Sequence, residues 1–244
     1  IILNNSGENT INTGAGNDAL DNHGERSIIR GGDGDDGINN GIWDGDGWYS
    51  TLDAGAGNDA VNNNGKEVVI DLGAGNDNLR LWGESENATV YGGEGNDSIH
   101  NFCANNVTAY GGAGKDSLHI DGGYNIALYG EDGDDNLQNW GNPSEYITLD
   151  GGAGNDYFDN DHDNATLIGG EGNDTFRVGG TSSANLLVDG GSGNDSINAI
   201  NVLESTIDAG AGADTVTGKF TNSYISAGAD NDVTRLNDAT NNTV

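Results

Sequence analysis

Positively charged residues, cysteine and long apolar segments are scarce in this chain of 244 residues. Lysine and arginine number only 8 against 40 aspartates and glutamates, so the formal net charge is -32 at pH 7. A chain this acidic repels nucleic acid phosphates and anionic lipids. It also contains no run of about 18 apolar residues, the length that spans a membrane. We therefore expect neither nucleic acid binding nor membrane insertion.

The single cysteine, Cys103, excludes a disulfide framework, so stability must come from backbone ladders, packing and metal ions. An unpaired cysteine is usually a small buried residue, and we expect that role here. The chain begins at Ile1 without a basic and then apolar signal segment, which suggests a processed product or an excised fragment.

Glycine and aspartate are abundant instead, and they form a repeat. Twelve times a glycine-rich turn of six residues ends in an aspartate, and successive aspartates are 18 to 23 residues apart. A period near 19 is typical of one coil of a solenoid for each repeat. The closing aspartates are Asp18, Asp36, Asp59, Asp77, Asp97, Asp116, Asp135, Asp156, Asp174, Asp195, Asp214 and Asp232.

Each repeat predicts two short strands when the turn is numbered 1 to 6, with the aspartate at position 6. Position 8 is apolar in all coils except the last, where it is Thr234, and its neighbours are mostly polar. A second apolar residue lies two residues before position 1 in every coil. This alternation is typical of strands with one buried face. Because the repeat runs nearly end to end, we predict a single all-β domain, residues 1–244: a parallel β-solenoid of about twelve coils.

Position 10 should also face inward, and it is asparagine in six coils. Asparagines stacked in register can hydrogen-bond their amides along a solenoid. We interpret them as structural rather than catalytic. They are Asn22, Asn40, Asn63, Asn101, Asn139 and Asn160.

The turn itself has the chemistry of a cation site. Glycine at positions 2 and 4 permits positive φ and lets the turn point its carbonyl oxygens inward. Oxygen ligands without histidine or cysteine clusters select hard cations such as calcium, which takes about 6 to 8 ligands. Parallel coils stack about 4.8 Å apart, so two successive turns can share one ion. Twelve turns then predict one row of up to about eleven Ca2+ ions along one edge.

Residues 92–100 read Gly-Gly-Glu-Gly-Asn-Asp-Ser-Ile-His, which resembles the nonapeptide Gly-Gly-x-Gly-x-Asp-x-hydrophobic-x of the RTX repeat family. The resemblance covers about residues 10–236 and implies a right-handed, β-roll-like solenoid with calcium between adjacent turns. In that family the ligands are the carbonyls of positions 1 and 3 from one turn, those of positions 2 and 4 from the next, and both aspartates. Each interior aspartate would then bridge two ions.

The carbonyl ligands that the resemblance implies belong to Thr13, Gly14, Ala15, Gly16, Gly31, Gly32, Asp33, Gly34, Ala54, Gly55, Ala56, Gly57, Leu72, Gly73, Ala74, Gly75, Gly92, Gly93, Glu94, Gly95, Gly111, Gly112, Ala113, Gly114, Gly130, Asp132, Gly133, Gly151, Gly152, Ala153, Gly154, Gly169, Gly170, Glu171, Gly172, Gly190, Gly191, Ser192, Gly193, Ala209, Gly210, Ala211, Gly212, Ala227, Gly228 and Ala229.

Two departures from the family pattern affect these expectations. The chain has one such turn in each coil where the standard RTX roll has two, so it should carry one calcium row. In this respect it resembles the solenoid segments of large bacterial RTX adhesins, including the ice-binding segment. Glu131 replaces glycine at position 2 and Asp230 replaces it at position 4, which puts those two sites in doubt.

Three outward features could have roles of their own. His100 and His119 share position 9 on neighbouring coils and could stack, but no third metal ligand is evident. Tyr91, Tyr110 and Tyr129 precede three successive turns, and such a row can either dock sugar rings or stabilise the sheet alone. An insertion at residues 41–48, with two tryptophans, is either a loop with its own contacts or a plain bulge.

An incomplete row of threonines precedes the turns, and regular threonines on a flat face favour ice binding. The row is interrupted, and position 3 of the turn is never threonine, so ice binding is a minor alternative. The threonines are Thr10, Thr51, Thr89, Thr108, Thr148, Thr166 and Thr206.

The charge balance also favours calcium. Eleven ions would supply about 22 positive charges and bring the formal charge to about -10, whereas without metal the stacked aspartates should keep the chain unfolded. Sites of this kind suit the millimolar calcium found outside cells. We expect a non-enzymatic calcium-binding rod of a secreted or cell-surface bacterial protein, such as an adhesin, surface layer or fibre. End-to-end self-association or a surface or glycan ligand would be its further partners. The alternative is a calcium-dependent export and folding module of an RTX exoenzyme or toxin.

Overall fold

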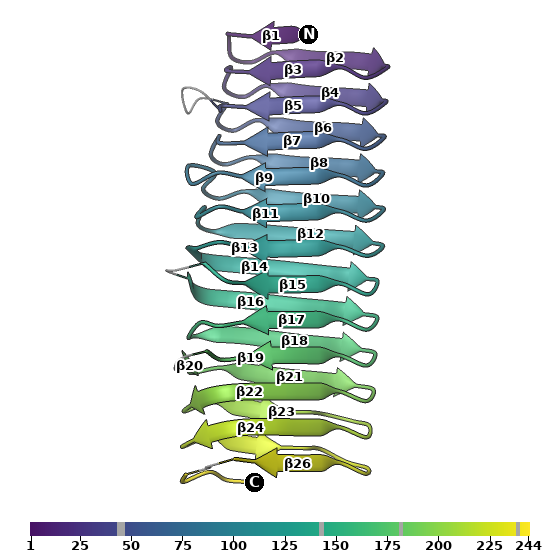
Figure 1. Ribbon diagram of the computed structural model, residues 1–244. Coiled ribbons are helices and arrows are strands. Elements are labelled where there is room, and N and C mark those ends of the chain that lie inside the picture. The colour runs from purple at the N-terminus through teal and green to yellow at the C-terminus, as the bar shows by residue number, and fades with distance from the viewer. Residues whose placement is uncertain (43–46, 142–143, 181–182, 238–239) are drawn as a thin grey trace.

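The computed structural model describes residues 1–42, 47–141, 144–180, 183–237 and 240–244. Within these ranges every regular element is a strand, and no helix that could cross a membrane occurs there. The strands stack into one parallel solenoid with the N-terminus at one end and the C-terminus at the other (Figure 1). The predicted all-β solenoid of about twelve coils is confirmed.

One sheet holds the strands that follow the glycine-aspartate turns. Each strand pairs in parallel with the equivalent strand of the next coil, and β20 (Ser183–Ala184) lies beside β22. In order, the strands are β1 (Ile2–Asn4), β3 (Ala19–Asn22), β5 (Gly37–Asn40), β7 (Ala60–Asn63), β9 (Asn78–Leu81), β11 (Ser98–Asn101), β13 (Ser117–Ile120), β15 (Asn136–Asn139), β17 (Tyr157–Asn160), β19 (Thr175–Val178), β22 (Ser196–Leu203), β24 (Thr215–Thr221) and β26 (Val233–Leu236).

The second sheet holds the strands that lead into the turns, and it is also parallel throughout. Its strands are β2 (Thr10–Ala15), β4 (Ile28–Asp33), β6 (Thr51–Ala56), β8 (Val69–Ala74), β10 (Thr89–Glu94), β12 (Val107–Ala113), β14 (Gly123–Asp132), β16 (Ser144–Ala153), β18 (Ala165–Glu171), β21 (Leu187–Ser192), β23 (Thr206–Asp208) and β25 (Tyr224–Ser226).

The core is a thin layer between the two sheets. The apolar residues at position 8 are buried in all eleven coils that have one, and Phe158 stacks on Phe176 with ring centroids 4.5 Å apart. The second inward row is buried as well, apart from Ile11 in the first coil, which is only partly covered. Thr234 is exposed because β26 is the last strand of its sheet. Each coil therefore buries its apolar residues against its neighbours.

The inward asparagines form the expected ladder in parts of the solenoid. Asn22 donates its side-chain amide to Oδ1 of Asn40, and Asn40 donates to Oδ1 of Asn63, both at 2.6 Å. Asn139 donates to Asn160 in the same way, at 2.7 Å. All six asparagines are buried, so the structural interpretation is supported by their hydrogen bonds.

The expectation for Cys103 was wrong. The residue is exposed, has a φ of 64° and donates its thiol to the carbonyl of Asp121 at 3.0 Å. It follows β11 in a loop on the side away from the glycine-aspartate turns, where the left-handed backbone turns the side chain outward. Of the insertion at residues 41–48, residues 43–46 lie outside the described ranges, so its role stays a prediction.

Candidate metal sites along the turn edge

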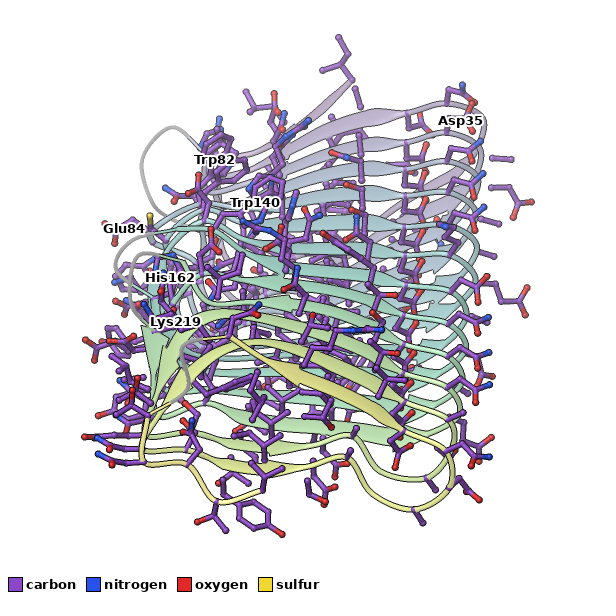
Figure 2. All side chains as sticks on the ribbon, turned by 60° about the horizontal axis from the view of Figure 1, so that its bottom comes forward. Asp35, Trp82, Glu84, Trp140, His162 and Lys219 are labelled. Atoms are coloured by element: carbon purple, nitrogen blue, oxygen red, sulfur yellow. The ribbon has the colours of Figure 1, made fainter. Side chains whose placement is uncertain are left out.

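The twelve glycine-aspartate turns form one edge of the solenoid, here called the turn edge. Figure 2 shows Asp35 on this edge, with Trp82 and Trp140 on the opposite side of the molecule. In the fifth turn, Gly93 and Gly95 have φ values of 107° and 127°. A Cβ at Gly93 would also overlap the carbonyl oxygen of Gly73 in the preceding coil. Glycine therefore favours both this backbone conformation and the close stacking of the coils.

The two irregular turns keep the same backbone path. Glu131 and Asp230 have φ values of 75° and 92°, which is the left-handed region that non-glycine residues rarely adopt. The carbonyl of Glu131 still lies against Gly152 in the next coil, as the equivalent carbonyls do elsewhere. The substitutions add backbone strain but do not redirect these turns.

In every turn after the first, one oxygen of the closing aspartate joins its turn to the preceding one. The Oδ1 atom of Asp116 accepts a hydrogen bond from the backbone N–H of Asp97 at 2.7 Å. The same bond, 2.7 to 3.1 Å long, links every successive pair from Asp18 to Asp232. The aspartates therefore form a continuous ladder along the turn edge.

The other carboxylate oxygen, Oδ2, is buried and has no hydrogen-bond partner in ten of these aspartates. A buried polar atom without a partner is costly, and a run of ten is not a packing accident. These atoms are the Oδ2 atoms of Asp36, Asp59, Asp77, Asp97, Asp116, Asp135, Asp156, Asp174, Asp195 and Asp214. The turn edge thus contains a row of unsatisfied acceptors.

Burial raises the pKa of most of these aspartates, because it disfavours the charged form. The amide hydrogen bond to Oδ1 acts in the opposite direction, and in most cases neighbouring aspartates add to the rise. The pKa reaches about 6 in Asp59, Asp77, Asp97, Asp116, Asp135 and Asp174, and about 7 in Asp156 and Asp195. Without metal, ionisation of these carboxylates near neutral pH therefore destabilises the folded chain.

Main-chain oxygens converge on the same space. A Cβ added to Gly92 would overlap the carbonyl oxygen of Gly111, in the next coil, and would lie 2.7 Å from Oδ2 of Asp97. Glycine at position 1 leaves this interior space open between the two oxygens. The same pairing occurs at Gly31, Gly111, Gly130, Gly151, Gly169 and Gly190.

Carbonyls of the preceding coil face the gap from the other side. The carbonyl oxygens of Gly93 and Gly95 point toward Gly112 and Gly114 of the next coil. The position 3 carbonyl, from Ala113, also points into this gap and accepts the N–H of Gly95 at 2.8 Å. Between the fifth and sixth turns lie the carbonyls of positions 2 and 4 from the earlier turn and of positions 1 and 3 from the later one, which reverses the order given in the sequence analysis.

The donor set fits a hard cation. No three His, Cys, Asp or Glu side chains among the described residues lie close enough together to hold a metal ion, so an ion here would take most of its ligands from main-chain oxygens. Carboxylate and carbonyl oxygens in this number suit calcium. The residue-by-residue ligand set and the count of about eleven ions stay predictions.

The spaces between successive turns, here called gaps, are not all equivalent. Thr13 donates its hydroxyl to the carbonyl of Gly31 at 2.5 Å, so this side chain uses an oxygen that a cation in the first gap would need. Ala54, Leu72 and Ala209 at position 1 are buried in the core and fill the interior space that glycine leaves open. The sequence assigned position 1 only a carbonyl oxygen as a metal ligand. The structure shows that its side chain also points inward.

The outward histidines belong to a larger aromatic cluster. His100 and His119 lie 5.1 Å apart, His100 stacks on Phe102, and Phe102 stacks on Trp82 at 4.8 Å. Burial, with His119 as a further cause, lowers the pKa of His100. The sequence indicated only the histidine pair, because Phe102 and Trp82 follow their strands at position 11, outside the regular pattern.

Comparison with known proteins agrees with this geometry. The sequence profile of the RTX calcium-binding nonapeptide repeat matches residues 5–23, 82–100, 104–127, 148–164, 163–181, 187–199 and 208–237. No curated protein sequence matches the chain.

Among solved structures, the fold is similar to the crystal structure of a hyperactive, Ca2+-dependent, β-helical antifreeze protein from an Antarctic bacterium. The TM-score is 0.76 at 24% sequence identity, over 98% of this chain and 80% of the other. At this identity the likeness concerns the fold. The repeat matches cover more than half of the sequence, and the chain therefore belongs to the family of proteins built from the RTX calcium-binding nonapeptide repeat.

Proposed function

We propose that this chain is a structural rod that folds when calcium binds between successive turns of the turn edge. The observation that carries the proposal is the row of ten buried Oδ2 atoms without partners. In the seven turns with glycine at position 1, this oxygen and a main-chain carbonyl oxygen of the next coil border the same space. The interior aspartates, Asp36 to Asp214, and the carbonyls of positions 1 to 4 would hold the ions. Bound calcium would supply the positive charge that lets the carboxylates stay ionised inside the fold.

The charge of the chain supports coupling between calcium binding and folding. Aspartates one coil apart repel each other, and the formal charge of -32 opposes any compact state without cations. Carbonyl-rich sites of this kind bind calcium at the concentrations found outside cells. We therefore place the rod in a secreted or cell-surface bacterial protein, where it would act as a spacer in an adhesin, surface layer or fibre.

Circular dichroism with and without calcium tests the proposal. The chelated chain should lack the β-type spectrum at neutral pH, and added calcium should restore it while equal magnesium should not, because magnesium dehydrates reluctantly and demands stricter geometry. Calorimetric titration would then count the ions. A spectrum that stays β-type under excess chelator would reject calcium-dependent folding.

A second candidate function is ice binding, which one observation favours. Exposed asparagines at position 5 form a regular ladder on the turn edge: Oδ1 of Asn58 accepts the N–H of Asn76, and Oδ1 of Asn76 accepts that of Asn96, at 2.9 and 2.8 Å. Regularly spaced amides on a flat edge could order water. Against it, position 3 beside this ladder holds charged residues such as Asp33 and Glu94, and no threonine.

Thermal hysteresis measured with calcium present separates the two candidates. A rod without ice affinity should leave the freezing point at its colligative value. A concentration-dependent freezing gap, lost on chelation and reduced by substituting Asn76 and Asn96 with leucine, would support ice binding.

A further inference from the structure

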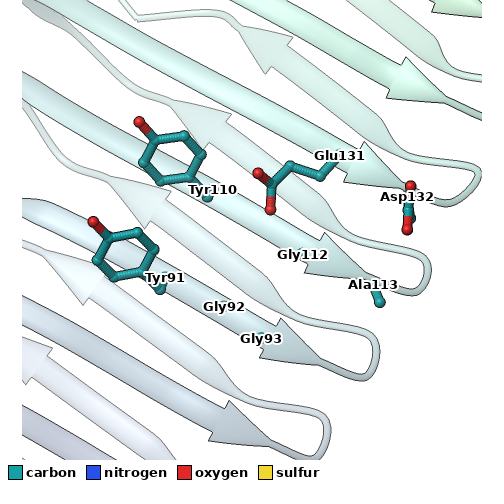
Figure 3. A pocket seen from close by; sticks show the side chains of 8 residues that line it. All are labelled: Tyr91, Gly92, Gly93, Tyr110, Gly112, Ala113, Glu131 and Asp132. Atoms are coloured by element: carbon teal, nitrogen blue, oxygen red, sulfur yellow. The ribbon is translucent and has the colours of Figure 1, made fainter.

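A groove of about 450 Å³ lies on the outer face of the sheet that leads into the turns. Tyr91 and Tyr110 form one wall, the glycines of positions 1 and 2 line the floor, and Glu131 and Asp132 stand at the other side. Figure 3 shows the side chain of Glu131 extending from its strand back toward Tyr110. None of these side chains takes part in the aspartate ladder.

Glu131 is the feature that distinguishes this groove from the rest of the face. Position 2 is glycine in the other eleven coils, and Glu131 keeps the left-handed conformation with a φ of 75°. The strain gives the chain no stability, but it places a carboxylate on a face where every other coil has no side chain. Within the described parts of the chain Glu131 forms no salt bridge.

The surroundings of the tyrosines select the charge of an occupant. In the sheet register, Tyr91 pairs with Asp71 on one side of the row, and Tyr129 pairs with Asp150 on the other. The row is thus bracketed by carboxylates at both ends and faces a third at Glu131. An anionic ligand would be repelled here, and a cationic one attracted.

The stacking of the tyrosine rings also restricts the shape of a ligand. Tyr91 and Tyr129 cover the two faces of Tyr110, with ring centroids 5.3 and 5.0 Å away. A sugar ring, which stacks on an aromatic face, finds both faces of Tyr110 covered, whereas the ring edges remain open to the groove. An apolar stem can lie along these edges, and its charged end can donate hydrogen bonds to the carboxylate of Glu131.

We propose that this groove binds an ammonium or guanidinium group on an apolar stem, namely a lysine or arginine side chain of a partner protein. The head group would pair with the carboxylate of Glu131, while the stem packs on the tyrosine ring edges and the glycine floor. The calcium-bound rod would then carry a docking point for a basic partner between its fifth and seventh coils.

Nuclear magnetic resonance of tyrosine-labelled, calcium-bound full-length chain tests this. The probes are Nα-acetyl-lysine amide and Nα-acetyl-arginine amide, with the uncharged Nα-acetyl-norleucine amide and a methyl glycoside as comparisons. At least one cationic probe should give saturable shifts at Tyr91 and Tyr110, about tenfold weaker in Glu131→Gln because one charge-assisted contact is lost. Glu204→Gln removes the same charge from another left-handed residue (φ 48°), exposed in a far-side loop away from the turn edge, and should leave the affinity unchanged.

A second variant, Glu131→Gly, tests the proposal if Glu131→Gln folds poorly. It restores the glycine of the other coils, so it should fold at least as well and still lose binding. The proposal is overturned if the norleucine or glycoside probe binds as tightly as the cationic ones, or if no probe gives saturable shifts. Equal weakening by Glu131→Gln and Glu204→Gln would overturn it too, because it would indicate attraction by overall charge alone.

Discussion

Replacing Asp97 with asparagine should separate the charge of a turn-edge carboxylate from its shape. The side chain is only 2% exposed, its Oδ1 accepts the N–H of Asp77 at 2.8 Å, and its Oδ2 has no partner. Asparagine can keep the first bond, and its NH2 group can donate to the nearby carbonyl of Gly111. The substitution therefore preserves the metal-free geometry and removes a ligand that the proposal shares between two ions.

The size of the effect follows from that shared position. Removing one partner from a buried ionic contact costs about 3–5 kcal/mol. In a chain of this length each kcal/mol shifts the midpoint of thermal unfolding, Tm, by about 2–4 °C. Asp97→Asn should thus lower Tm by about 6–20 °C in saturating calcium. Asp18→Asn, at an end of the row, should lower it less, because Asp18 borders a single gap.

Thermal unfolding followed by circular dichroism at fixed, saturating calcium measures these shifts. Asp53→Asn is the matched control, since this half-exposed carboxylate on the outer face has only an exposed ion pair with Arg30 and should change stability by no more than about 1 kcal/mol. In chelator, where we expect folding only in acid, Asp97→Asn should keep a β-type spectrum to a higher pH than the unaltered chain. Burial raises the pKa of Asp97 to about 6, so its ionisation opposes folding, and asparagine removes that charge. A Tm loss no larger than that of Asp53→Asn would refute the assignment of this aspartate to calcium.

Three further results are expected. Because the pKa values of the turn-edge aspartates are raised to about 6 or 7, protonation should stabilise the metal-free solenoid in acid. This stabilisation should be lost as the pH rises through these pKa values. Circular dichroism in chelator from pH 4 to 8 measures the effect, and folding that is independent of pH would contradict it. Asn40→Ala should lower the free energy of unfolding by about 2–4 kcal/mol in calcium, because it removes the buried hydrogen bonds that join Asn40 to Asn22 and Asn63. Urea titration measures this. Glu131→Gly should raise Tm by about 2–4 °C by relieving roughly 1 kcal/mol of backbone strain, and a lower Tm would show that the side chain stabilises the fold.

Much of the fold could be predicted because the repeat is one-dimensional. Each coil contacts mainly its neighbours, so a residue at a given position packs against the same position one period away. Position 8, the row before the turn and the asparagines of position 10 were all placed correctly on the inward face by this rule. The prediction failed for Cys103, because the loops on the far side differ in length and do not repeat.

The geometry of the turn edge was predicted only in part, because periodicity does not specify the directions of side chains. Periodicity indicated which aspartates stack, and the resemblance supplied a ligand set, but neither showed how each carboxylate is oriented. The structure decided that Oδ1 joins neighbouring turns while Oδ2 stays buried without a partner, and that the side chain of position 1 faces the same space. It also decided that Glu131 crosses toward tyrosines of earlier coils.

The amino-acid sequence by itself determined the repeat, the two inward rows, the acidic charge and the twelve glycine-aspartate turns, because these depend on residue type and spacing. Only the tertiary structure decided which oxygens meet between coils, which turns leave room for an ion and which aromatic side chains cluster. Those features depend on side-chain directions and on contacts between neighbouring coils, and spacing along the chain does not specify them.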